Sequence, residues 1–102
     1  MGFKLIYAPE IYNDLQENIN WYNEKIPGLG HRFYKAVKTK ISVIKKNPYA
    51  LAIRYDDIRC GKVKDFPFMI HFKIFPETNL IKVIAVFSTH RNPDLWYFRN
   101  TY

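Results

Sequence analysis

The chain has 102 residues, of which 48% are hydrophobic and 18% aromatic, which is enough for one packed core and excludes a disordered segment. Lysine and arginine outnumber aspartate and glutamate by 16 to 9, and the net charge of +7 favours an anionic partner such as nucleic acid or an acidic protein segment. No apolar run approaches the ~20 residues that span a bilayer, and we expect neither a signal peptide nor a membrane partner. Because Cys60 is the only cysteine, we expect no internal disulfide and a reducing, cytoplasmic setting.

The charged residues are segregated along the chain. Acids dominate residues 9–25, whereas residues 31–46 contain cations and no acid. The acids are Glu10, Asp14, Glu17 and Glu24, and the cations are Arg32, Lys35, Lys38, Lys40, Lys45 and Lys46. Solubility alone would not require this separation. The cationic segment is therefore either an ordinary solvated face or a surface that contacts phosphates or an acidic protein.

The first half of the chain predicts a strand followed by two helices. Residues 3–7 are β-prone, and apolar residues then recur at helical spacing from Ile11 to about Lys25. Two glycines and a proline in residues 27–30 break this helix. The second helix has an apolar face made of Phe33, Val37, Ile41 and Ile44. It ends at Asn47, because the residue before a proline avoids helical geometry. Two helices joined by so short a loop predict an antiparallel hairpin.

The second half of the chain predicts strands. Residues 52–55 are a candidate extended segment, residues 56–57 a turn, and residues 58–65 a strand in which Gly61 marks a hairpin or a bulge. From Phe68 to Ile74 the apolar residues alternate with a period of two, and residues 76–79 form a turn. Residues 80–87 are nearly all apolar, as in a central strand covered on both faces.

The order β-α-α-β-β-β predicts an α+β fold for a single domain over residues 1–102, with a helical hairpin packed on a mainly antiparallel sheet. Phe33 and Ile70 should lie in its core, and Trp21, Tyr22 and Tyr34 should be core or rim aromatics. His71 fits a sheet histidine with its hydrogen bonds satisfied, and His31 a solvated one. Three scattered histidines without nearby carboxylates give no reason to expect a metal site.

Several segments, in this order along the chain, resemble the RelE/ParE superfamily of toxins. In the helical half they are Ala8, Asp14-Leu15, Trp21-Tyr22, Pro27 to Gly30, Arg32-Phe33, Ala36, Ile44 and Asn47-Pro48. In the strand half they are Ile58-Arg59, Val63, Phe66 to Ile70, Val86 to Arg91, Pro93 and Trp96. The resemblance covers nearly the whole chain. It implies the RelE/ParE toxin fold and a type II toxin–antitoxin (plasmid stabilisation) system, in which a cognate antitoxin neutralises the toxin.

The superfamily has two branches that differ in chemistry. ParE-like toxins inhibit DNA gyrase by binding, and the segments Phe66 to Phe68 and Arg91 to Trp96 are closer to this branch. RelE-like toxins cleave mRNA, often on the ribosome. We therefore expect a toxin that arrests growth by binding an essential cytoplasmic target, such as gyrase, without a cofactor. A ribosome-associated mRNA endonuclease that works without a metal is the alternative, so whether the chain is an enzyme stays open.

A nuclease would need a base for the ribose 2′-hydroxyl, cations for the phosphate and an acid for the leaving oxygen. The resemblance implies that His90, Arg91, Lys62 and Lys64 would supply these groups. Strand alternation would put the two lysines on one face of the sheet. Two departures favour the binding branch. Met69 stands where the nucleases have an arginine, and only Tyr97 could replace their tyrosine, after a register shift.

Two further pairs of residues are candidates for binding. Arg54 and Arg59 could extend a basic groove with the strand lysines, or they could instead pair with Asp56, Asp57 and Asp65. Trp96 and Tyr97 are large aromatics that could anchor a protein target. For the antitoxin, we expect an acidic or amphipathic segment that packs along the helical hairpin and the sheet edge.

Overall fold

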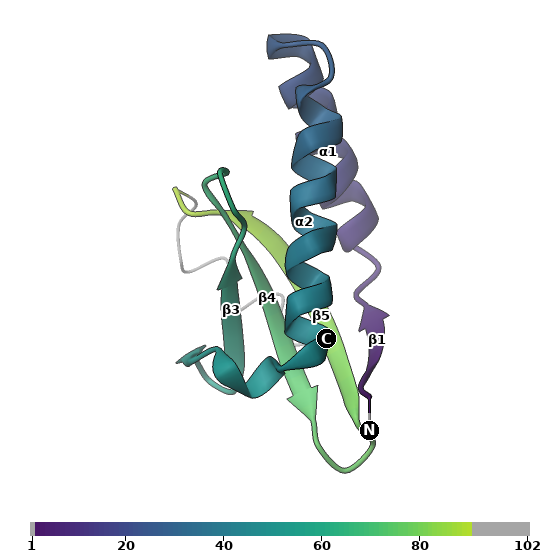
Figure 1. The fold of residues 1–102 in the computed structure, drawn as a ribbon, viewed down its shortest axis with the longest axis vertical. Coiled ribbons are helices and arrows are strands. Elements are labelled where there is room, and N and C mark those ends of the chain that lie inside the picture. Colours follow the sequence, from purple (N-terminus) through teal and green to yellow (C-terminus); the bar gives the residue numbers. More distant parts are fainter. Residues whose placement is uncertain (1, 91–102) are drawn as a thin grey trace.

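The computed structural model describes residues 2–90, which form two long helices and a five-stranded sheet (Figure 1). The elements are β1 (Lys4–Tyr7), α1 (Ile11–Lys25), α2 (Leu29–Lys46), the short 3-10 helix η1 (Pro48–Ala50), β2 (Ile53–Tyr55), β3 (Ile58–Lys62), β4 (Phe68–Phe75) and β5 (Leu80–Ser88). Both predicted helices, the hairpin turn before β5 and the α+β class are confirmed. In the part described, no helix is both long and apolar enough to cross a membrane.

The two helices form the predicted hairpin and lie side by side (Figure 1). The chain reverses at Gly28, whose φ of 87° lies in the left-handed region that favours glycine. Gly30 then allows the helices to approach closely, because a Cβ there would lie 2.3 Å from the carbonyl oxygen of Ile19. The Gly30 amide donates a hydrogen bond of 2.8 Å to Oδ1 of Asn23. These contacts fix the position of α2, which carries six of the chain's 16 lysines and arginines, relative to α1.

The strands pair in the order β1-β5-β4-β3-β2, and only β1 and β5 run parallel to each other. The short β2 makes one strand more than the predicted order, and it forms a hairpin with β3 through Asp56, whose φ is 47°. Gly61 marks neither a hairpin nor a bulge, because it pairs regularly with Ile70 inside β3. Register irregularities lie instead on β2, between Ile53 and Tyr55, and on β5, where Ile84 is an extra residue opposite the step from His71 to Phe72.

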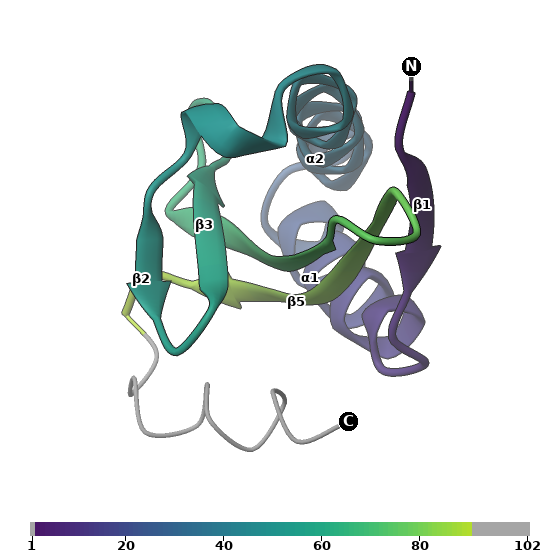
Figure 2. The same cartoon turned by 90° about the horizontal axis from the view of Figure 1, so that it is seen from below.

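The main core lies between the helices and the sheet, which curves around the helix pair when viewed from below (Figure 2). Phe33 and Ile70 are completely buried there, as predicted. A second buried cluster lies on the opposite face of the sheet and comes from strands alone: Tyr55, Ile58, Cys60, Ile84, Ala85 and Phe87. Strand β5 is apolar almost throughout because its side chains contribute to the clusters on both faces of the sheet. At the bulge, the two successive residues Ile84 and Ala85 both belong to the second cluster.

Candidate functional site

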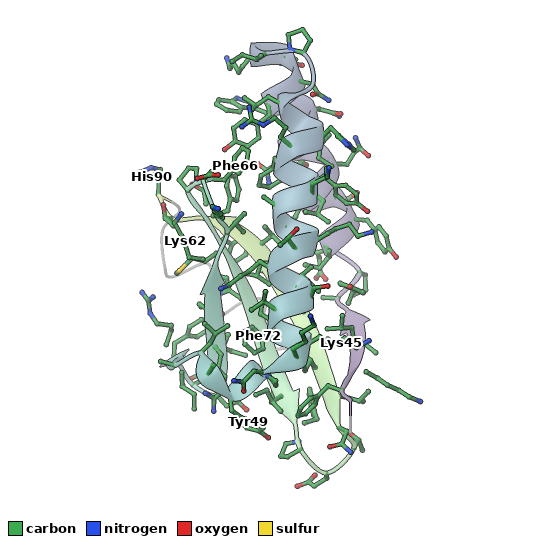
Figure 3. All side chains as sticks on the ribbon, in the orientation of Figure 1. Lys45, Tyr49, Lys62, Phe66, Phe72 and His90 are labelled. Atoms are coloured by element: carbon green, nitrogen blue, oxygen red, sulfur yellow. The ribbon has the colours of Figure 1, made fainter. Side chains whose placement is uncertain are left out.

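Three of the candidate site residues, Lys62, Lys64 and His90, lie at the end of the sheet where β3 and β5 finish and β4 begins. Lys62 pairs with Met69, and Met69 pairs with Phe87 on the next strand. Neighbouring strands are about 4.8 Å apart, so β3 and β5 are separated by roughly 10 Å at this level. Figure 3 shows Lys62, Phe66 and His90 at this end of the sheet, while Lys45 and Tyr49 lie toward the opposite end.

On one side of this end is a groove of about 350 Å³ between α2 and the turn that joins β3 to β4, which we call the basic groove. It is lined by Arg32, Ala36, Thr39, Lys40 and Val43 from α2, and by Lys62, Lys64, Asp65 and Phe66 from the end of β3 and the turn. The α2 residues recur every three or four positions and therefore share one face of the helix. The fold thus brings Lys62 and Lys64 together with two cations of the acid-free helix. The strand expected over residues 58–65 ends at Lys62, so Lys64 lies in the turn and strand alternation does not relate the two lysines.

Lys62 has a structural role as well as a place in the groove. Its Nζ donates hydrogen bonds to the carbonyl oxygens of Val63, at 2.9 Å, and Phe66, at 2.7 Å. The Val63 amide in turn donates to the carbonyl oxygen of Phe68 at 2.9 Å. An ammonium group has three N–H donors, so Lys62 keeps one for a ligand. Lys64 makes no such contact among the described residues, and its charge faces the groove.

Lys40 reaches the groove across the backbone of β3. A Cβ added at Gly61 would lie 3.0 Å from Cε of Lys40 and 3.3 Å from the side chain of Ile44. The aliphatic part of Lys40 therefore packs on the strand while its ammonium remains at the groove, as long cationic side chains commonly do. A glycine is needed at position 61 because α2 side chains pack closely against the strand there. The backbone torsions at this position do not themselves require glycine.

On the other side of the turn, His90 lines a different hollow of about 400 Å³. Its other lining residues are Glu17, Asn18, Trp21, Tyr22, Pro67, Phe68 and Ser88. The His90 amide donates to Oγ of Ser88 at 3.2 Å. His90 therefore does not share a hollow with Lys62 and Lys64. Of the other candidates, Arg91, Trp96 and Tyr97 lie outside the described residues.

Arg54 and Arg59 do not extend the basic groove, because neither lines it. Nη1 of Arg54 lies 3.8 Å from Sδ of Met69 at the sheet edge. The guanidinium of Arg59 stacks 5.3 Å from the ring centre of Tyr49 and donates to the carbonyl oxygen of Leu51. The alternative expected from the sequence was that these arginines pair with nearby aspartates. Among residues 2–90, neither arginine forms such an ion pair, and Asp57 instead pairs with Lys73 at 2.9 Å.

A tyrosine-lined hollow of about 210 Å³ lies between the end of β1, the first half of α1 and a face of α2 different from the one that lines the basic groove. Tyr7, Tyr12 and Tyr34 surround it, and its remaining lining residues are Ile11, Leu15, Val37, Lys38 and Ile41. The three phenols line the same hollow. Burial, with smaller contributions from Tyr12 and Tyr34, raises the pKa of Tyr7. Tyr12 is 74% exposed, which is unusual for so large an aromatic outside an interface. The sequence indicated only that Tyr34 is a core or rim aromatic, and it gave no sign of this hollow.

The second buried cluster contains a polar centre that the sequence did not reveal. His71 is completely buried, and its Nδ1 lies 3.0 Å from the hydroxyl of Tyr55 and 3.4 Å from Sγ of Cys60. Burial, assisted by the positive charge of Arg54, lowers the pKa of His71 to about 4. Burial raises the pKa of Cys60 to about 11. Both groups are therefore neutral at pH 7, and their burial makes them a structural element of the sheet.

Residues 2–90 contain no group of three or more histidine, cysteine or acidic side chains arranged to hold a metal ion. The groups available for chemistry in the described part are thus cations at the basic groove, an exposed histidine at the end of β5, and clustered aromatic side chains. This arrangement suits the binding of anionic or amphipathic partners.

Comparison with solved structures places this architecture among bacterial toxin folds. The chain is similar to a protein of the chromosomal ParDE TA system from P. aeruginosa, with a TM-score of 0.74 and 13% identity over 84% of this chain and 95% of that chain. It is similar to an arginine-to-alanine double mutant of E. coli toxin RelE in the free state, with a TM-score of 0.73 and 14% identity over 99% of this chain and 97% of that chain. It is also similar to the isolated E. coli RelE toxin, with a TM-score of 0.66 and 15% identity over 97% of each chain.

The chain therefore has the RelE/ParE toxin fold, as the resemblance in the sequence implied. At identities of 13–15% these similarities concern the fold, and functional roles must come from the site itself. No protein-family model and no curated protein sequence matches the chain.

Proposed function

We propose that this chain is the toxin of a type II toxin–antitoxin (plasmid stabilisation) system, acting in the cytoplasm and arresting growth by binding an essential target, with DNA gyrase as the first candidate. The observation that carries this proposal is the structural similarity of 84% of the chain to a ParDE-system protein and of 99% of the chain to RelE. The basic groove and the exposed aromatics add surfaces suited to macromolecular partners.

Binding without catalysis is favoured by how the candidate nuclease groups are distributed. The basic groove holds cations and a single carboxylate, Asp65, but no histidine. His90 lines the separate hollow beside α1. Lys62 already donates two hydrogen bonds from its ammonium group to carbonyl oxygens of the turn. Acid–base catalysis needs the proton-transfer group within hydrogen-bonding reach of the substrate atom that the cations hold. Met69, where the nuclease branch has an arginine, lies beside Lys62 and adds no charge there.

An mRNA endonuclease remains the second candidate, because one observation favours it. His90 is exposed at the end of β5, and Lys62 and Lys64 lie at the same end of the sheet. A strand of RNA lying across the turn could contact both sides. In this case His90 would act as the acid or base and Arg91 would hold phosphate, without a metal.

Growth arrest on induced expression separates the two candidates. If the chain is a nuclease, His90→Ala should reduce cleavage by about 10²–10⁴-fold and abolish toxicity. If it is a binding toxin, His90→Ala should remain toxic, because no proton transfer is required, whereas Trp96→Ala or Tyr97→Ala should lose toxicity through a missing aromatic anchor. Soluble protein levels and thermal melts of each variant control for folding.

The target is then assigned with two assays run in parallel on the purified protein. Inhibition of gyrase supercoiling without mRNA cleavage supports the binding toxin. Cleavage of mRNA during translation, lost in His90→Ala while Trp96→Ala keeps wild-type toxicity, supports the endonuclease instead. If expression of the soluble wild-type chain leaves growth unchanged in a host that lacks any antitoxin, the proposal of a toxin is wrong.

A cognate antitoxin is part of the same proposal. The tyrosine-lined hollow lies along the helical hairpin beside Tyr7 at the end of β1, where large rigid aromatics could anchor an antitoxin segment. Co-expression with the product of the neighbouring small gene should yield a stable complex. Tyr12→Ala should weaken that complex, whereas Tyr49→Ala, at a half-exposed tyrosine that does not line the hollow, should not. Absence of any complex at low salt contradicts this part of the proposal.

A further inference from the structure

We infer that this protein forms a two-fold symmetric homodimer, in which β1 of one copy pairs antiparallel with β1 of the other and joins the two sheets into one. The interface lies apart from the basic groove, and the partner is a second copy of the same chain. Dimer formation can be tested on the purified protein, whether or not the chain is a toxin.

Strand β1 lies at the edge of the sheet and has backbone groups without a neighbouring strand. It pairs with β5 alone and lies at the margin of the molecule (Figure 2). Just after β1, the amide of Ala8 donates to the carbonyl oxygen of Val83 on β5 at 2.9 Å. In a parallel pair, alternate residues direct both backbone groups to the same side, so those of Leu5 and Tyr7 point away from β5. No other strand among residues 2–90 receives them.

The two edge strands of the sheet differ in how well they resist a further strand. β2 has an irregular register with β3 and carries Arg54 at its centre. Irregular pairing and a charged side chain are common means of preventing edge-to-edge association. β1 instead pairs with β5 in an unbroken register, contains no proline, and has Ile6, which is 41% exposed, near its centre. β1 is therefore the edge to which a strand can be added.

Exposed aromatic side chains continue from this edge onto the helices. Tyr7, which is 44% exposed, ends β1 and lines the tyrosine-lined hollow together with Tyr12 and Tyr34. The same two tyrosines of the helices line an adjacent hollow of about 270 Å³. Among the described residues, Lys38 is the one charged side chain that lines either hollow. Copies with a net charge of +7 repel each other over most of their surface, so a nearly uncharged region is where they can meet.

The outward-pointing groups of β1 define a symmetric register. If Leu5 of each copy pairs with Tyr7 of the other, every one of these pairs exchanges two backbone hydrogen bonds. The two-fold axis then passes through Ile6, as an interface made of the same patch on both copies requires. Ile6 lies opposite its own counterpart, with the two Cα atoms about 4.5 Å apart.

This register also brings opposite charges together. Lys4 of one copy lies opposite Ala8 of the other, two residues before Glu10. Among residues 2–90, Lys4 forms no ion pair, and Oε1 of Glu10 is shielded from solvent without a hydrogen-bond partner. A shielded carboxylate oxygen that lacks a donor is unfavourable. The ammonium group of Lys4 from the second copy would supply that donor.

Sedimentation of the full chain over a range of concentrations measures the dimer. The wild type should dissociate on dilution. Ile6→Lys places two ammonium groups side by side on the axis and should raise the dimer dissociation constant about tenfold or more. Ile53→Lys makes the same change at an exposed isoleucine of β2 and should leave the constant unchanged. Thermal melts establish that every variant is folded.

Charge reversal tests the register. Lys4→Glu or Glu10→Lys alone should weaken the dimer about three- to tenfold, because the symmetric interface contains the pair twice. The double variant should return close to the wild-type constant, since the pair is re-formed with its charges exchanged.

A cross-link provides an independent measurement of the same register. Ile6→Cys should form a covalent dimer when the protein is oxidised with diamide, because a Cα separation of about 4.5 Å lies within the range of disulfides. Ile53→Cys should not, and neither should the wild type, whose Cys60 is buried.

A wild type that remains monomeric at every concentration overturns the inference. It is also overturned if Ile53→Lys is as harmful as Ile6→Lys, or if the two charge reversals add instead of compensating. A monomer that binds the product of the neighbouring small gene, and loses it through Ile6→Lys, would show that the edge receives a different strand and that the homodimer is wrong. Growth arrest is measured separately, so a dimer whose expression leaves growth unchanged contradicts the proposed function alone.

Discussion

The two faces of the sheet are built in different ways. The face under the helices is closed by apolar side chains alone, with Phe33, Ile44 and Phe72 completely buried. The opposite face places a buried histidine among three strands, within hydrogen-bonding distance of a tyrosine of β2 and a cysteine of β3. Apolar packing is non-directional and insensitive to pH, whereas a buried imidazole depends on its proton and its partners. The first face should therefore provide most of the stability, and the second should fix the position of the β2–β3 hairpin and make stability depend on pH.

The largest expected effect comes from breaking the helix-covered face. Phe33→Ala removes a completely buried ring that stacks at 4.8 Å from Phe68, and such truncations typically cost about 3–5 kcal/mol. A small domain has only ~5–15 kcal/mol of unfolding free energy, so most of the margin would be lost. Chemical denaturation monitored by circular dichroism measures this. Ile70→Ala should behave similarly, while Val43→Ala on the exposed side of α2 is the control. A Phe33→Ala protein as stable as the parent would show that the core lies elsewhere.

The next effect is acid destabilisation through the opposite face. His71 has a pKa of about 4 in the folded protein, below the ordinary histidine value of 6.5, because burial penalises the charged ring. As the pH falls, the unfolded chain therefore takes up this proton first. The stability that His71 contributes is complete above pH ~6.5 and declines as the pH falls toward 4, by roughly 3 kcal/mol in total.

Denaturation midpoints measured between pH 6.5 and 4 give the slope of unfolding free energy against pH. His71→Gln retains a polar side chain but does not titrate, so its unfolding free energy should vary less between pH 6.5 and 4 than that of the parent. His90→Gln is the matched control, since His90 is exposed. Identical slopes for the parent and for His71→Gln would mean that the buried histidine does not control the acid response.

A smaller effect should follow from removing a single hydroxyl on the same face. Tyr55→Phe deletes the group that lies 3.0 Å from Nδ1 of His71 but keeps the ring, and the net loss should be about 0.5–1.5 kcal/mol. The loss should be concentrated in the β2–β3 hairpin, where hydrogen exchange of the backbone amides would accelerate. Tyr49→Phe, whose ring is half-exposed, should change neither quantity. Equal effects of the two substitutions would remove the argument that this hydroxyl organises the opposite face.

Much of the fold followed from local features of the sequence. The helical spacing from Ile11 and from Phe33, the break at residues 27–30 and the alternation from Phe68 predicted both helices and the central strands. These features act over a few residues, because the period of a helix or strand fixes which side chains share a face. Phe33 and Ile70 were assigned to the core for the same reason, and both are completely buried.

Contacts between distant segments were decided only by the tertiary structure. The sequence offered residues 52–55 only as a candidate extended segment, and β2, three residues long, is a strand because it pairs with β3. The extra residue Ile84 shifts the alternation of β5, and an almost wholly apolar strand gives no sign of where such a shift occurs. The cluster of Tyr55, Cys60 and His71 likewise depends on the register of three strands.

The candidate site divides in the same way. The sequence located the strand lysines and His90 and separated the acid-free helix from the acidic one, because residue types and charge order are visible in a linear chain. It did not show that Arg32 and Lys40 share a groove with Lys62 and Lys64, or that His90 faces a different hollow across the turn. Those relations depend on how α2 packs over β3, which Gly61 permits by leaving room for the side chains of Lys40 and Ile44 on the strand. Periodicity determines which side chains share a face, and long-range packing determines which faces meet.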